Sequence, residues 1–156
     1  MKLLMDSDCL IKLTKSKLKE IVCRNFTVII SQAVKEETID NAHGHPDAVI
    51  IEENLKKGLL ALSKTKSLSK KGEDSIFSIY KLGKFDAICS DDKRFVSRLR
   101  FFDIPYITPA VFIAILLKRG RLTIKEAYIK LDMLSPFISD DEYNAIKLLL
   151  VTWRLQ

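Results

Sequence analysis

Short apolar runs and helically spaced apolar residues alternate along the first two thirds of the chain. The short runs predict buried strands near residues 3–5, 26–30, 59–62, 85–90 and 104–107. The intervening segments carry apolar residues three and four positions apart, which predicts helices. This alternation is typical of an α/β fold with a parallel sheet.

The last third predicts three helices, over residues 110–119, 123–133 and 139–154, the second with a Thr-x-x-Glu capping box at its start. Their apolar residues exceed what one small sheet edge needs, so we expect part of this surface to pair in a homodimer. The alternative is that the last helix folds back over the sheet and buries its stripe within one chain. The residues are Val111, Phe112, Ile115, Leu116, Ile146, Leu149, Leu150 and Trp153.

The composition predicts a single folded domain and an anionic partner. A chain of 156 residues is close to the usual size of one domain, and 29% charged with 47% hydrophobic residues argues against disorder. The net charge of +6 favours an anionic partner, of which nucleic acid is the commonest.

Three cysteines without metal-ligand spacing, Cys9, Cys23 and Cys89, predict buried thiols in a reducing compartment, so we expect a cytoplasmic protein. The N-terminal segment lacks the apolar run of a signal peptide. The most apolar later stretch, Val111 to Leu117, is too short to cross a bilayer, so no membrane role is expected.

Aspartates follow two of the predicted strands. Asp6 ends the first strand, and Asp91 and Asp92 follow the strand at 85–90. In an open parallel sheet, ligands bind outside the carboxyl ends of the strands, so these residues are expected at a binding edge. Asp6 or Asp8 is also a candidate N-cap for the helix that begins near Cys9, and Asp8 fits that role better.

Two glutamates are expected at the same edge. Glu37 lies about 60° around the helix from Val34, whereas Glu36 lies about 160° away, so Glu37 faces the site if Val34 packs on the sheet. Glu73 is in the first turn of the helix that begins at Gly72, a place where the helix dipole favours acids in any case.

Four carboxylates at one edge, Asp6, Glu37, Glu73 and Asp91, would repel one another unless a cation were bound. Mg²⁺ or Mn²⁺ takes such oxygen ligands, activates water and stabilises phosphoryl transition states. Surrounding Lys and Arg residues would then hold a phosphate backbone. The loop at 63–71 contains four lysines and is either a phosphate-binding loop or a solvated turn. These are Lys64, Lys66, Lys70 and Lys71.

These segments together resemble the PIN-domain ribonucleases, including the toxin subunits of bacterial and archaeal toxin–antitoxin pairs. The resemblance extends from Lys2 to about Thr108. The matching segments are residues 3–13 (LLMDSDCLIKL), 30–37 (ISQAVKEE), 72–74 (GED) and 86–95 (DAICSDDKRF).

The resemblance implies an α/β/α sandwich, with a nuclease domain over residues 1–120 and a helical extension over 121–156 packed on the same domain. It implies a divalent-metal-dependent endoribonuclease that cleaves single-stranded RNA, with an antitoxin protein as one candidate partner. The metal ligands would be Asp6, Glu37, Glu73 and Asp91, with Asp74 and Asp92 as alternates for the last two. RNA contacts are expected from Lys12, Lys93, Arg94 and Arg98.

Two other functions stay open. A PIN-like module that has lost activity would bind RNA or a protein without cleaving. A haloacid-dehalogenase-like phosphatase would use Asp6 and Asp8 as nucleophile and acid and hold Mg²⁺ with Asp91 and Asp92. The phosphatase interpretation leaves Glu37 and Glu73 without a role.

Overall fold

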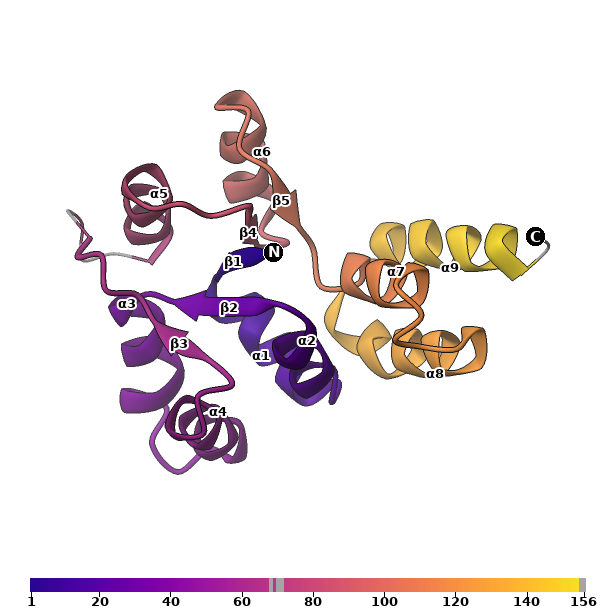
Figure 1. The fold of residues 1–156 in the computed structure, drawn as a ribbon, viewed down its shortest axis with the longest axis horizontal. Coiled ribbons are helices and arrows are strands. Elements are labelled where there is room, and N and C mark those ends of the chain that lie inside the picture. The colour runs from indigo at the N-terminus through magenta and orange to yellow at the C-terminus, as the bar shows by residue number, and fades with distance from the viewer. Residues whose placement is uncertain (68, 70–71, 155–156) are drawn as a thin grey trace.

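The structure is a computed structural model that describes residues 1–67, 69 and 72–154, so Lys70 and Lys71 of the basic loop lie outside the described residues. A five-stranded sheet forms its centre, with all neighbouring strands parallel and in the order β3-β2-β1-β4-β5 (Figure 1). The strands are β1 (Lys2–Met5), β2 (Thr27–Ile30), β3 (Ala61–Leu62), β4 (Ala87–Cys89) and β5 (Tyr106–Ile107).

Helices connect successive strands and cover both faces of the sheet. In Figure 1, α5 and α6 lie on one side of the sheet, and α1, α2 and α4 lie on the other. The connecting elements are α1 (Ser7–Lys15), α2 (Lys19–Asn25), α3 (Gln32–Lys35), the π-helical turn η1 (Glu36–Asp40), α4 (Pro46–Lys56), α5 (Gly72–Leu82) and α6 (Lys93–Phe101). The predicted fold class, an α/β protein with a parallel sheet between helical layers, is confirmed.

The core is centred on β1, which is the middle strand of the five. Leu3, Leu4 and Met5 are fully buried, as expected for a short apolar run with both faces covered. All three cysteines lie in the described part of the chain and are buried free thiols, as their apolar surroundings predicted.

The C-terminal helices form one packed group. α7 (Val111–Lys118), α8 (Ile124–Leu134), the 3₁₀ turn η2 (Ser135–Phe137) and α9 (Asp140–Arg154) follow β5, and α7, α8 and α9 contact one another. Helix α8 also contacts α1, which places the group beside the helical layer that contains α1 and α2 (Figure 1). Helix α7 lies before the boundary between residues 120 and 121 and packs with the two helices after it, and the division into a nuclease domain and a helical extension stays a prediction.

The apolar residues of these helices are largely used within the chain. Phe112, Leu116, Ile146 and Leu150 are buried, and the other four residues of the predicted surplus are half-buried against the core. This packing uses part of the predicted apolar surplus within the chain, and the homodimer stays a prediction. The capping box of α8 is present as predicted. Within the described residues, no helix combines the length and the apolar character needed to cross a bilayer.

Candidate metal and nucleic-acid site

The strand register brings the carboxyl ends of the central strands to one edge. Met5 pairs with Ile30 on one side and with Cys89 on the other. The residues that follow these strands therefore emerge together, and the backbone N–H of Asp6 donates to the carbonyl of Cys89 at 3.1 Å. This edge is where an open parallel sheet binds ligands.

Asp6 is buried, with 8% of its surface exposed. It is the N-cap of α1, since its Oδ1 accepts from the backbone N–H of Cys9 at 2.7 Å. The expectation that Asp8 fits the cap better was wrong: Asp8 lies in the first turn, because the helix begins at Ser7 directly after the strand.

Burial raises the pKa of Asp6 to about 7. Hydrogen bonds from Ser90 and Cys9 lower it, and the charges of Asp8 and Asp91 raise it further. The cap therefore holds a buried carboxyl in an acidic neighbourhood, and the charge of Asp6 in turn helps to raise the pKa of Lys12.

A cleft of about 170 Å³ opens beside Asp6. Carboxylates from separate parts of the chain reach it, which brings together three of the four acids predicted from the sequence, Asp6, Glu37 and Glu73. The lining residues are Asp6, Ser7, Asp8, Glu37, Gly72, Glu73, Ile76 and Asp92. We call this the acid cleft.

Glu37 points into the acid cleft and Glu36 does not. Glu37 accepts a hydrogen bond from the hydroxyl of Ser7, which follows Asp6 directly. Glu36 instead accepts from the side-chain amide of Gln32 at 3.2 Å. Val34 is fully buried, as the helix argument required. The turn that carries both glutamates is π-helical and not α-helical as the prediction assumed. The two side chains still point to different sides, as predicted.

Glu73, rather than its neighbour Asp74, lines the acid cleft. Burial raises the pKa of Glu73, and the negative charge of Asp92 adds to the rise. Asp74 forms an ion pair with Arg98 at 2.5 Å, outside the lining residues. The structure thus separates the two acids that the sequence left as alternatives.

Asp92, rather than Asp91, lines the acid cleft. Asp92 is the N-cap of α6 and accepts from the backbone N–H of Phe95 at 2.8 Å. Asp91 forms an ion pair with Lys12 at 2.6 Å. The second oxygen of Asp91, Oδ1, is buried without a hydrogen-bond partner among the described residues. The acid that the sequence named as the alternate is therefore the one placed with the other three.

Glu142 is a site neighbour that the sequence analysis missed. This half-buried residue of α9 accepts from the backbone N–H of Ala110 at 2.8 Å and is hydrogen-bonded to the side chain of Thr108. Burial raises its pKa, Asp91 adds to the rise and Lys12 opposes it. Nothing in the local sequence distinguishes Glu142 from the other acids at the start of α9, because only the packing of α9 brings it near Asp91.

The predicted RNA-contacting residues fall into two pairs. Lys12 and Arg98 are held by Asp91 and Asp74, so their charges are partly neutralised within the chain. Lys93 and Arg94 are exposed in the first turn of α6, directly after Asp92. Positive charge is thus available at the rim of the acid cleft.

The lining side chains fit Mg²⁺ or Mn²⁺ by their chemistry, since they offer carboxylate and hydroxyl oxygens. Within the described residues, no group of three or more His, Cys, Asp or Glu side chains is arranged to hold a metal ion. Mg²⁺ commonly keeps several waters and binds through one or two carboxylates and substrate phosphates, so one or two of these side chains are sufficient.

Comparison of the chain with models of known protein families found no match, and comparison with curated proteins found no similar sequence.

Proposed function

We propose that this protein is a divalent-metal-dependent endoribonuclease of the PIN type that cleaves phosphodiesters of single-stranded RNA. The observation that carries the proposal is the acid cleft, where carboxylates that follow β1 and β4 meet those of η1 and α5. The position of these acids at the carboxyl edge of a parallel sheet supports a ligand site there rather than a solvated acidic surface.

The residues divide the work as follows. Asp6 and Asp92 are fixed by the helix N-termini that they cap, so they are the best-placed carboxylates to hold a metal ion. Glu37 and Glu73 complete the acidic wall, and Ser7 orients Glu37 through its hydroxyl. When bound, the ion supplies Lewis-acid activation of water and neutralises charge on the phosphoryl group. Lys93 and Arg94 contact the RNA backbone at the rim.

The biological setting is an extension of the same proposal. A toxin of a toxin–antitoxin pair, with an antitoxin as its protein partner, is one setting in which such an activity occurs. The buried free thiols are in keeping with a reducing compartment such as the cytoplasm.

The experiment is a substrate comparison with purified protein. Mixed single-stranded RNA and a phosphatase substrate are each incubated with Mn²⁺, with Mg²⁺ or with EDTA. We expect the RNA to be shortened with Mn²⁺ or Mg²⁺ and not with EDTA, and no phosphate to be released from the phosphatase substrate. Phosphate release alone would favour the phosphatase, and RNA binding without cleavage would favour the inactive module.

A further inference from the structure

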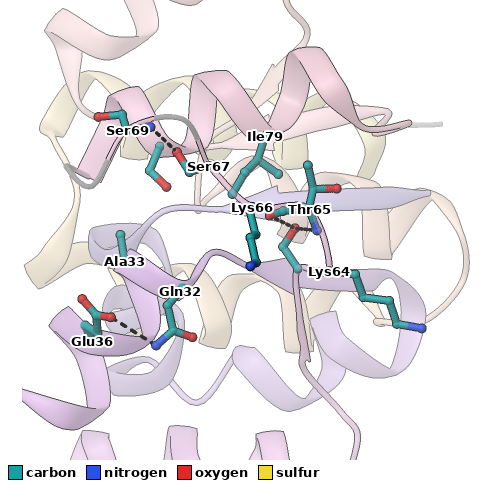
Figure 2. Close-up of a pocket in the computed structure, with 11 residues that line it drawn as sticks. Gln32, Ala33, Glu36, Lys64, Thr65, Lys66, Ser67, Ser69 and Ile79 are labelled. Carbon is teal, nitrogen blue, oxygen red and sulfur yellow. Dashed lines mark hydrogen bonds between the residues drawn. The ribbon is translucent and has the colours of Figure 1, made fainter.

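A second and larger cavity, of about 660 Å³, lies at the carboxyl end of β3. Its walls come from α3 and η1, from the loop after β3 and from α5 (Figure 2). The lining residues are Gln32, Ala33, Glu36, Ser63, Lys64, Thr65, Lys66, Ser67, Ser69, Ser75 and Ile79. We call it the loop cavity. Its volume is within the range of about 300–1,000 Å³ that small-ligand sites occupy.

The loop cavity shares its walls with the acid cleft. Glu36 lines the loop cavity and Glu37, the next residue, lines the acid cleft. On α5, Ser75 lines the loop cavity and Ile76 lines the acid cleft. The two hollows are thus neighbours on either side of the place where α3 and α5 contact each other.

Positive charge and hydroxyl groups gather on the loop side of the cavity. Lys64 and Lys66 are exposed and form no ion pair with the described residues. In Figure 2, the Lys66 side chain runs toward the middle of the lining group, whereas Lys64 points away from it. Thr65 adds a hydroxyl group to the lining, whereas the hydroxyl of Ser63 is used within the loop, where it donates to the carbonyl of Thr65 at 3.3 Å and accepts from its backbone N–H at 3.1 Å. Ammonium and hydroxyl groups are the donors that phosphate oxygens accept from.

The opposite side has a different chemistry. There Gln32 and Glu36 are hydrogen-bonded to each other, with the amide and carboxylate partly open to the cavity. Ala33 and Ile79 supply apolar surface between the two sides. A carboxylate disfavours a second phosphate but accepts from a ribose hydroxyl or a base amino group. A site with one cationic side and one hydrogen-bonding side suits a nucleotide better than an inorganic anion.

We propose that the loop cavity binds a nucleotide of the RNA strand that flanks the bond to be cleaved, with its phosphate held by Lys66. This inference rests on the proposed ribonuclease function. It adds the path of the RNA strand, which runs from the acid cleft over the contact between α3 and α5 toward β3. Of the two alternatives for the basic loop, a phosphate-binding loop or a solvated turn, the inference favours phosphate binding, through Lys66.

The test measures RNA affinity separately from cleavage. A fluorescein-labelled single-stranded oligoribonucleotide is titrated in EDTA, where metal-dependent cleavage cannot occur, and anisotropy is followed at several salt concentrations. The variant is Lys66→Ala. The matched control is Lys57→Ala, which removes an exposed lysine that pairs with Glu53 at the end of α4, outside the residues that line either hollow.

Lys66→Ala should weaken binding about five-fold, the change expected for one exposed charge contact. It should also reduce the slope of log affinity against log salt by about 0.7, as expected when one contact to a single-stranded phosphate is lost. Lys57→Ala should bind as the unmodified protein does. Unfolding curves of both variants should match the parent, because both side chains are exposed.

Equal affinity and slope for Lys66→Ala and Lys57→Ala would overturn the inference. A second arm titrates uridine 5′-monophosphate. If Lys66→Ala weakens binding of the mononucleotide but leaves the oligonucleotide affinity unchanged, the loop cavity is a small-ligand site and does not bind the RNA strand. Lys66-dependent RNA binding in a protein that never cleaves RNA would contradict the proposed function and the placement of the nucleotide beside a cleaved bond, and it would support only the phosphate contact of Lys66.

Discussion

Lys19 offers a direct test of the energetics of the fold, because it is a buried amine in an unfavourable place. Only 2% of its surface is exposed, and its Nζ has no hydrogen-bond partner among the described residues. It is the first residue of α2, where the helix dipole disfavours a cation. Burial lowers its pKa from 10.5 to about 8, against the attraction of the nearby carboxylates Glu20 and Asp47. We predict that Lys19→Met stabilises the protein at neutral pH.

The magnitude follows from the two pKa values. The change from 10.5 in the unfolded chain to about 8 in the folded chain corresponds to about 3 kcal/mol, at about 1.4 kcal/mol per pH unit. Below pH 8 Lys19 is charged in both states, so the cost is fully present. Between pH 8 and 10.5 the unfolded chain binds more protons, so the stability contribution rises with pH. The gain from Lys19→Met should therefore be up to about 3 kcal/mol at pH 7 and should shrink above pH 8.

The assay is urea unfolding of both proteins from pH 7 to pH 10. Buried thiols act in the opposite direction at the upper end: burial raises the pKa of Cys23 to about 12, so the folded chain binds more protons there and loses stability as pH rises. Lys19 lowers the pKa of Cys23, but a pKa of about 12 keeps the folded Cys23 protonated between pH 7 and pH 10 in both proteins. The effect of the thiol therefore cancels in the difference between them. Lys125→Met, an exposed lysine of α8, is the control and should change little. A Lys19→Met variant that is less stable at pH 7, or a gap that does not narrow with pH, would refute the reasoning.

Three further predictions concern the site, the fold and the assembly. Glu37→Gln should lower Mn²⁺ affinity, whereas Glu36→Gln should leave it unchanged, because only Glu37 lines the acid cleft; calorimetric titration decides, and the reverse order would contradict the placement. Ser31→Ala should cost about 1 kcal/mol in urea unfolding, because the buried Ser31 caps α3 by accepting from the backbone N–H of Val34 at 3.1 Å; an unchanged midpoint would show that the cap contributes nothing. Light scattering should give the mass of a homodimer, as the apolar surplus of the last helices predicts, and a single species of monomer mass at micromolar concentration would contradict that prediction.

The strands and helices could be predicted because their signals are local. Buried strands such as β1 appear as short apolar runs, and starts such as Thr123 or Ser31 carry a side chain that caps the following helix. The acids at strand ends followed from the same pattern, since a parallel sheet places the carboxyl ends of its strands together.

The finer assignments depended on contacts between distant residues. Asp91 and Asp92 are adjacent and chemically identical, and their roles separate because Lys12 of α1 pairs with one of them. Asp74 likewise pairs with Arg98 of α6 and does not line the acid cleft. Glu142 comes near Asp91 only through the packing of α9. No periodicity within a segment encodes such pairings.

The most direct test of the central claim is RNA cleavage by Asp6→Asn. Asparagine caps helices as well as aspartate does, so the variant should keep α1 and unfold like the parent while it loses a charge needed in the acid cleft. Asp141→Asn, an exposed acid in the first turn of α9, is the matched control. We expect the parent and the control to cleave single-stranded RNA with Mn²⁺ and not with EDTA, and Asp6→Asn to show no cleavage. Cleavage by Asp6→Asn at the parent rate, in protein freed of contaminating nuclease, would contradict the account.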